Sequence, residues 1–353
     1  MREAADPEKR HYKNAFILLS QLILTTGTLG IVIRMKGVSA GFRLALAVIL
    51  FGNAMICLAA LCLWMAIRLK KKSILTCSGE DILIVAPHQD DCVAIAGGYA
   101  IQTRMQGGRV TVLYATDGPA HDKRTRKWEA LEAWTQLGIR RDGIHFLKHH
   151  MSTGFTSAEE IRTGIGEFAA FIEQCNPDIV FIPLYEGGHY QHDAVNYMVH
   201  QAVRRIGFQG KVYESPEYNF YLSFKTTPGK ILSGLTRFIP FIRYDYPPEP
   251  IRDDEVMHLR MTHEQIEMKK RMLSKFTSQN PEQLAVRFGF EDRYQKLHDY
   301  DYRKPPFNYE RSVVRFLNGL KSVPLLGRPV SGMFKWTKTI HPDPGVVMTQ
   351  IPI

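Results

Sequence analysis

The sequence predicts an α/β protein, a Rossmann-like three-layer sandwich with a mostly parallel sheet, preceded by an N-terminal transmembrane helical hairpin. Between residues 81 and 202, short continuous apolar runs alternate with helical patterns, which is typical of buried parallel strands joined by crossover helices. Two long uncharged runs precede this region. The 353 residues are 45% apolar and 23% charged, which excludes a disordered or collagen-like chain and allows a sizeable core.

Residues 15–33 and 44–67 form the two apolar runs without a charged side chain. A helix needs roughly 20 apolar residues to cross the hydrocarbon core of a bilayer, and both runs reach about this length. The ten residues between them suit a hairpin turn. We therefore expect residues 1–72 to be a membrane anchor with two spans. The alternative is a helical hairpin buried in a soluble core, but such helices rarely run this long without charge.

Basic residues are concentrated beside these runs. Residues 1–72 hold 11 Lys or Arg and 3 Asp or Glu, a net charge of +8, whereas residues 73–353 hold 34 and 32. The nearly neutral remainder argues against nucleic acid as a partner and favours membrane lipid at the basic segment. Slightly more Lys and Arg lie outside the hairpin than in its turn, which places the following domain in the cytoplasm. The five cysteines show no disulfide spacing, in agreement with a reduced compartment.

The elements after the anchor are predicted from apolar runs and caps. Three buried strands are expected, at residues 82–86, 110–115 and 179–183. Helices are expected at residues 92–105 and 126–137, between Ser157 and Asn176, and around residues 195–202. Ser157 and Glu160 form a capping box for the third helix. Ligands bind beyond the carboxyl ends of parallel strands, so the chemistry should lie just after the three strands.

Acidic and imidazole side chains follow two of these strands. His88, Asp90 and Asp91 come directly after the first strand, and His189 and His192 follow the third. A catalytic zinc takes about three His, Asp or Glu ligands and keeps one position for water, whose pKa it lowers. A further carboxylate can accept the proton of that water, and a further imidazole can serve the leaving group. Each motif alone is weak, because Asp is common in turns and His pairs occur by chance, but together they predict one shared metal site.

An ordered series of motifs surrounds these side chains. It comprises Pro87-His88-Gln89-Asp90-Asp91-Cys92, Gly97-Gly98, Thr116-Asp117-Gly118, Arg126-Lys127-Trp128-Glu129, His189-Tyr190-Gln191-His192 and, more loosely, a Lys-rich helix before Ser278-Gln279. The series resembles the PIG-L/LmbE-like family of zinc-dependent de-N-acetylases. The resemblance covers residues 81–279. It implies a deacetylase domain over residues 73–285, which leaves residues 286–353 as a C-terminal extension of unknown role.

The resemblance implies a role for each matching side chain. His88, Asp91 and His192 would hold one zinc ion per chain. Asp90 would be the general base toward the metal-bound water. His189 would stabilise the oxyanion of the tetrahedral intermediate or protonate the departing amine.

The resemblance also suggests residues that contact the substrate, and two positions depart from the family pattern. The resemblance implies that Arg126 contacts the substrate, for instance through an anionic group, and Asp117 is a weaker candidate for the same role. Cys92 and Gln191 stand where the family has carboxylates. Loss of the acidic residue between the two histidines should weaken the general-acid role of His189, and Asp193 is placed to compensate.

These features together predict a membrane-anchored zinc hydrolase that removes an N-acetyl group from an N-acetylglucosamine-containing conjugate. The anchor favours a lipid-linked substrate at the bilayer surface, while the acceptor and the oligomeric state are left open. One alternative is an amidase or deacylase that acts on a non-sugar amide. Another is a non-catalytic, membrane-tethered sugar-binding protein, which the absence of bound metal would favour.

Overall fold

The protein is described from a computed structural model, which covers residues 7–35, 37–69, 73–117, 122–149, 155–185, 189–217 and 256–302. The chain divides into two compact units, and the boundary between their described residues falls between residues 69 and 73. Most of the expected C-terminal extension, from residue 303 onward, lies outside the described residues.

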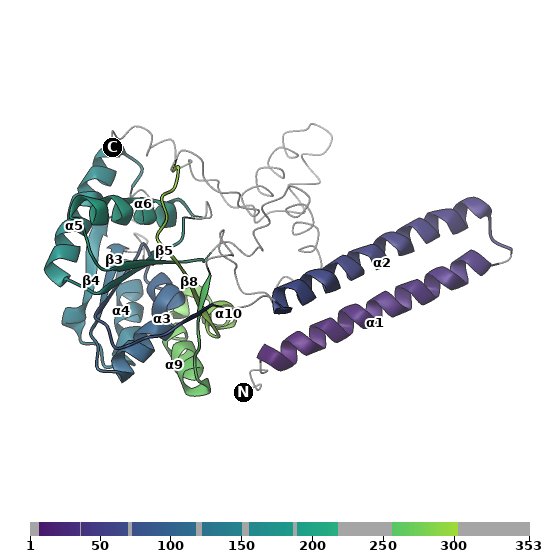
Figure 1. Ribbon diagram of the computed structural model, residues 1–353, viewed down its shortest axis with the longest axis horizontal. Helices are drawn as coiled ribbons and strands as arrows, with labels where there is room; N and C mark the ends of the chain where they lie inside the picture. Colours follow the sequence, from purple (N-terminus) through teal and green to yellow (C-terminus); the bar gives the residue numbers. More distant parts are fainter. Residues whose placement is uncertain are drawn as a thin grey trace. The chain divides into compact units, whose positions relative to one another are not determined.

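The described residues of the first unit form a hairpin of two helices, α1 (Pro7–Arg34) and α2 (Ala40–Leu69), which lie side by side (Figure 1). Asn53 Nδ2 of α2 donates a hydrogen bond of 2.9 Å to Thr25 Oγ1 of α1. Small side chains allow the close approach of two helices, and a polar pair between them fixes their register. The described side chains buried in this unit are Thr25, Val32, Ala54 and Cys57.

One helix of this hairpin is long and apolar enough to cross a membrane. The qualifying stretch is Ala40–Ala59 of α2, whereas the apolar part of α1 in the described residues, Leu19–Arg34, is shorter. The described residues therefore support one candidate span. The predicted second span and the predicted cytoplasmic orientation are not supported by them.

The second unit contains an eight-stranded sheet with the order β1-β7-β8-β6-β5-β2-β3-β4. Its strands are β1 (Ser73–Leu75), β2 (Ile82–Ala86), β3 (Val110–Thr116), β4 (Ile144–His149), β5 (Ile179–Pro183), β6 (Lys211–Ser215), β7 (Met257–Leu259) and β8 (Asp292–Lys296). Neighbouring strands are parallel except at β8, which is antiparallel to both β6 and β7. The predicted α/β class and mostly parallel sheet are confirmed, with one antiparallel strand that the sequence did not indicate.

Helices cover both faces of the sheet (Figure 1). They are α3 (Asp91–Met105), α4 (Lys123–Thr135), α5 (Ala158–Cys175), α6 (Tyr190–Arg205), α9 (His263–Leu273) and α10 (Pro281–Phe288), with short 3₁₀ turns η1 (Arg141–Gly143) and η2 (Thr277–Gln279). Because side chains alternate along a strand, Ile82 and Ile84 of β2 pack with α3, α4 and α9, whereas Leu83 and Val85 pack with α5 and α6. Both faces of β2 are buried, which explains its continuous apolar sequence.

The predicted elements are present with small shifts of their ends, and the capping box of Ser157 and Glu160 is formed. Five strands were not predicted from the sequence: β1, β4, β6, β7 and β8. The clearest case is β8, whose residues Asp-Arg-Tyr-Gln-Lys contain no apolar run. It lies beyond residue 285, in the segment expected to be an extension, yet it is hydrogen-bonded between β6 and β7. The sheet thus continues past the expected boundary.

The strand order reverses at β2. The chain proceeds from β2 to β3 and β4 on one side of the sheet, and β5 and β6 lie on the other side. The connections that leave β2 and β5 therefore diverge, and parallel sheets commonly bind ligands at such a point, beyond the carboxyl ends of the two strands. The motifs that begin at His88 and His189 both lie at this point.

Candidate metal centre

The turn between β2 and α3 carries the first three candidate side chains. β2 ends at Ala86, and α3 begins at Asp91, so His88 and Asp90 lie in the intervening turn. The backbone N–H of His88 donates a 2.9 Å hydrogen bond to Asp91 Oδ2. This hydrogen bond links the start of the turn to the Asp91 carboxylate at its end, and so fixes the orientation of the Asp91 side chain.

The start of α6 carries the two further imidazoles. His189 is the N-cap of α6, and its Nδ1 accepts a hydrogen bond from the backbone N–H of Gln191 at 3.3 Å. His192 lies in the first turn of the helix and is fully buried. The cap and the first turn thus present both rings at the carboxyl end of β5.

Three donor atoms, one each from His88, Asp91 and His192, converge on a single point. His88 Nδ1 lies 2.9 Å from Asp91 Oδ2, His192 Nε2 lies 3.1 Å from the same oxygen, and the two ring nitrogens are 3.3 Å apart. A tetrahedral metal with ligand distances of about 2.0–2.2 Å separates its donor atoms by roughly 3.3–3.6 Å. The side chains are at most 6% exposed. Their chemistry and spacing therefore fit one zinc-like ion.

Two polar side chains lie near the outer nitrogens of the imidazole rings. Gln191 Oε1 lies 2.7 Å from His88 Nε2. Because an amide oxygen only accepts hydrogen bonds, Nε2 carries the proton and the lone pair of His88 Nδ1 faces the converging donors. Gln191, which stands where the resembled family has a carboxylate, thus orients the His88 ring. Glu217 Oε1 lies 3.6 Å from His192 Nδ1 on the opposite side of that ring.

The sequence analysis did not identify Glu217 as a site residue. It is a buried carboxylate two residues after the end of β6, and the structure groups it with Asp91 and His192 as a possible ligand set. The rule that chemistry lies beyond strand ends would have indicated it, but β6 itself was not predicted, since only part of its short sequence is apolar.

His189 borders the same point. Its ring lies 4.9 Å from that of His88 and 5.3 Å from that of His192, measured between centroids. These three imidazoles form a second possible ligand set, with donor atoms within 4.8 Å of one another. His189 is less buried than His88 and His192, which are both buried.

Asp90 is held by Arg126 rather than by the converging donors. Arg126 Nη2 donates to Asp90 Oδ1 at 3.1 Å, and the Arg126 side chain is only 1% exposed against 15% for Asp90. Among the described residues, no hydrogen-bond partner reaches Arg126 Nε or Nη1. The sequence suggested a substrate contact for Arg126. The structure places its guanidinium against Asp90, whose carboxylate it orients.

Glu129 anchors the helix that carries Arg126. Glu129 Oε1 accepts hydrogen bonds from Thr277 Oγ1 at 2.8 Å and from the Ser278 N–H at 2.7 Å, and Oε2 accepts from Ser278 Oγ at 2.7 Å. The carboxylate is buried and has three donors. The Arg-x-x-Glu motif and the late Ser-Gln motif therefore meet, which explains why two motifs so distant in sequence belong to one site.

Asp117, the weaker candidate for a substrate contact, contacts Lys123 and the backbone of His149. It follows β3 at the same edge of the sheet, its carboxylate accepts a 2.5 Å hydrogen bond from Lys123 Nζ, and its N–H donates to the His149 carbonyl at 3.1 Å. Gly118 and the next three residues lie outside the described residues. These contacts link the end of β3 to α4 and to β4.

Burial and charge give the two adjacent carboxyls opposite properties. Burial alone would raise the pKa of Asp91, but His192 and His88 outweigh it and hold this pKa well below its usual range. Burial and the Asp91 charge raise the pKa of Asp90, and Arg126 only partly opposes them. Burial lowers the pKa of His192 despite the attraction of Asp91. An anionic Asp91 and a neutral His192 are the forms that bind metals.

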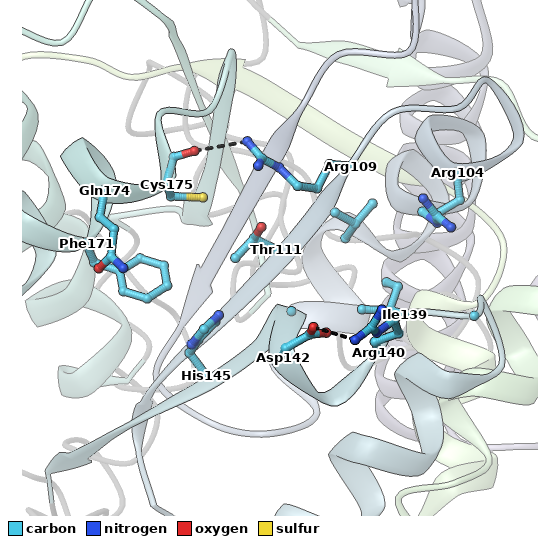
Figure 2. Close-up of a pocket in the computed structure, with 13 residues that line it drawn as sticks. Arg104, Arg109, Thr111, Ile139, Arg140, Asp142, His145, Phe171, Gln174 and Cys175 are labelled. Atoms are coloured by element: carbon cyan, nitrogen blue, oxygen red, sulfur yellow. Dashed lines mark hydrogen bonds and ion pairs between the residues drawn. The ribbon is translucent and has the colours of Figure 1, made fainter.

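A separate cavity of about 460 Å³ lies at the opposite edge of the sheet, beneath the amino ends of β3 and β4 (Figure 2). Arginines line it, but they already have partners. Arg109 donates to the Cys175 carbonyl at 3.1 Å, and Arg140 pairs with Asp142 at 3.1 Å, as Figure 2 shows. Ligands of parallel sheets bind at the carboxyl edge, so this cavity is not the candidate site.

The comparison with protein families matches a part of the second unit of the chain. A family model described as PIG-L, GlcNAc-PI de-N-acetylase, matches residues 83–203. No curated protein matches the chain.

Solved structures with similarity to the chain include the A40926 pseudoaglycone deacetylase Dbv21 (16% identity, 62% of this chain and 99% of that chain, TM-score 0.44). They also include N,N'-diacetylchitobiose deacetylase from Pyrococcus horikoshii (18%, 61% and 83%, 0.34). A third is GalB, the 4-carboxy-2-hydroxymuconate hydratase from Pseudomonas putida (14%, 65% and 98%, 0.36). Similarities this low, which include a hydratase, do not specify a reaction.

The family match runs from β2 to near the end of α6, and so includes both motifs of the converging donors. The resemblance that the sequence indicated is thereby confirmed, over a shorter range than residues 81–279. Residues 83–203 of this chain form a domain of the PIG-L family.

Proposed function

We propose that the protein is a membrane-anchored, zinc-dependent de-N-acetylase that acts on a lipid-linked N-acetylglucosamine conjugate. The observation that carries this proposal is the convergence of the His88, Asp91 and His192 donor atoms within 3.3 Å, beside Asp90, in a domain of the PIG-L family. Sugar de-N-acetylation is the activity by which that family is described.

His88, Asp91 and His192 would hold one zinc ion, and a bound zinc would supply Lewis-acid polarisation of the acetamide carbonyl and lower the pKa of water. Asp90 accepts the proton of the attacking water, and Arg126 keeps its carboxylate directed toward the centre. The water oxygen forms a bond to the carbonyl carbon, the amide C–N bond breaks, and acetate is released while the amine nitrogen takes up the proton that Asp90 accepted or one from His189. His189, at the rim of the centre, donates to the developing oxyanion or to that amine.

The hairpin supplies the membrane anchor in this proposal. Its exposed apolar side chains support burial in lipid, and they include Ile23, Leu24, Ile31 and Ile33 of α1 and Leu44, Val48, Ile49 and Phe51 of α2. The hydroxyls of Thr26 and Thr28 donate to backbone carbonyls one turn earlier, at 2.8 Å, so they tolerate an apolar environment. We infer that α1 crosses together with α2, held by Thr25 and Asn53, with the catalytic domain on the cytoplasmic side.

The test is metal content and acetate release by the full-length chain in detergent, with N-acetylglucosaminyl phosphatidylinositol and the free sugar as substrates. The wild type should bind about one Zn²⁺ per chain and release acetate. Asp90→Asn should retain the metal while turnover falls by on the order of 10²–10⁴-fold. The same change in Asp142, an exposed residue at the opposite edge, is the matched control and should leave both unchanged.

Two results contradict the proposal. A wild-type chain that binds no Zn²⁺ would exclude metal-dependent hydrolysis, and full turnover by Asp90→Asn would exclude Asp90 as the base. A preference for the free sugar over the lipid conjugate would argue against the lipid-linked substrate.

A further inference from the structure

Helix α3 is interrupted shortly after it begins. Ala96 has φ −141° and ψ 17°, outside the helical region, so residues 91–95 form a short first piece. This piece starts with Asp91, which takes part in the convergence of donor atoms. A helical piece of this length has too few internal hydrogen bonds to be stable by itself. Its position must therefore depend on contacts with other parts of the fold.

A buried ion pair lies at this interruption. Lys269 of α9 and Asp292 of β8 form an ion pair, and both side chains are fully buried. Lys269 Nζ also donates to the Ala94 carbonyl at 3.0 Å, and Asp292 Oδ2 accepts from the Tyr99 N–H at 3.1 Å. In an unbroken helix these two backbone groups would bond within the helix. The ion pair instead contacts one backbone group on each side of the break.

The glycine pair of the first motif makes room for this contact. A Cβ atom at position 98 would lie 2.6 Å from Asp292 Oδ2 and 2.4 Å from Met261 Sδ, closer than atoms can approach. A Cβ atom at Gly97 would lie 3.1 Å from Lys269 Cε. The Gly97-Gly98 sequence in α3 therefore matches an ion pair supplied by residues about 170 to 200 positions later.

A buried ion pair is seldom more stabilising than apolar side chains of the same volume, so stability alone does not account for this one. We propose, on the basis of the metal-dependent function proposed above, that Lys269 and Asp292 are positioning residues of the metal centre. They hold the break in α3 at a fixed geometry and thereby set the place of residues 91–95. Asp91 then meets His88 and His192 without rearrangement when a metal binds.

The decisive variant of the full-length chain is Lys269→Met/Asp292→Leu. It removes both charges together and leaves apolar side chains of similar size, so the fold should be retained. Since nothing then bonds the Ala94 carbonyl and the Tyr99 N–H from outside the helix, we expect Zn²⁺ affinity to fall by about tenfold or more, as it does when groups that orient ligands are lost. Competition with a chromophoric chelator measures this affinity, and circular dichroism checks the fold.

Lys270→Met is the matched control. Lys270 is the next residue of α9, but it pairs with Glu267 at 2.8 Å on a partly exposed face. Its loss should leave the Zn²⁺ affinity unchanged. A folded double variant with wild-type Zn²⁺ affinity would overturn the positioning role, and so would an equal decrease in the Lys270→Met control.

Amide hydrogen exchange of the metal-free chains separates this inference from the proposed function. Residues 91–95 should exchange at least several-fold faster in the double variant than in the wild type, while β2 and β5 should be unchanged. If the wild type binds no Zn²⁺, the proposed function fails, and the exchange result still decides whether the pair holds α3. Unchanged exchange at residues 91–95 would reject the inference even in a chain that binds metal.

Discussion

The two edges of the sheet use charged side chains in opposite ways. At the amino edge, opposite charges pair one to one near the surface, as in Arg140 with Asp142, whose side chains are 85% and 68% exposed. At the carboxyl edge, Asp90 and Asp91 are adjacent, and buried imidazoles crowd around Asp91. Exposed pairs contribute little to stability, whereas crowded buried groups cost free energy. Such a cost is typical of a functional site.

The largest difference between the two edges should appear when the same substitution is made at both. Asp91→Asn replaces a carboxylate with a neutral amide, and Oδ2 of that carboxylate lies close to both His88 and His192. We expect Zn²⁺ affinity to fall by more than the ~100-fold that loss of an outer partner costs, and acetate release to fall to background. Asp142→Asn should change neither. Zinc titration and an acetate assay measure these effects, and equal responses of the two variants would remove the distinction between the edges.

A smaller effect should follow from Gln191→Ala. This change leaves all three donors in place but removes the acceptor at His88 Nε2, so the His88 ring can rotate or bind its proton at Nδ1. We expect metal affinity to fall by roughly 10–100-fold. Gln174→Ala, at the rim of the cavity near the amino edge, is the matched control. Wild-type Zn²⁺ affinity in Gln191→Ala would show that the amide does not orient His88.

Glu129→Ala should act on the rate through Arg126. The variant leaves the Ser278 N–H without its acceptor, and a lost buried partner typically costs about 1–3 kcal/mol of stability. Because α4 then loosens, Asp90 loses its fixed orientation. We expect kcat to fall while Zn²⁺ affinity is retained. Glu132→Ala, exposed on the same helix, controls for the lost charge. A lower melting temperature with unchanged kcat would limit Glu129 to a structural role.

The smallest effect should come from Arg140→Ala. Its ion pair is exposed, so the free energy of unfolding should change by no more than about 0.5 kcal/mol, and deacetylation should be unchanged. Denaturant unfolding and acetate release test this. A clear loss of activity would mean that the amino edge contributes to function and would contradict the comparison from which these predictions start.

Much of this arrangement could be predicted from the sequence because its signals are local. The continuous apolar runs of β2, β3 and β5, and the capping box of α5, each depend on residues close together in the chain. The motifs at His88 and His189 follow two of those strands directly. The sequence therefore predicted both the fold class and the edge of the sheet at which the donor atoms now converge.

The remaining features depend on contacts between distant residues. Nothing near Arg126 in the sequence indicates that its guanidinium lies against Asp90. The role of Gln191 toward His88 depends on how α6 packs over β2, and a short strand such as β8 is stabilised by its two neighbours rather than by its own residues. Among the described residues, the stretch Ala40–Ala59 of α2 is a candidate span, and the apolar stretch Leu19–Arg34 of α1 is shorter.

The alternation of strands and helices, the uncharged N-terminal runs and the set of side chains available for metal chemistry can all be read from the sequence, because hydrophobic period and residue type are local properties. Which of these side chains meet depends on the packing of the folded chain. Tertiary packing brings the donor atoms of His88, Asp91 and His192 within 3.3 Å of one another. It also places Gln191 near His88 Nε2 and Glu217 near His192 Nδ1. The same packing forms the ion pair of Lys269 and Asp292 at the break in α3. These contacts depend on the packing of α3, α6, α9 and β8 around one sheet.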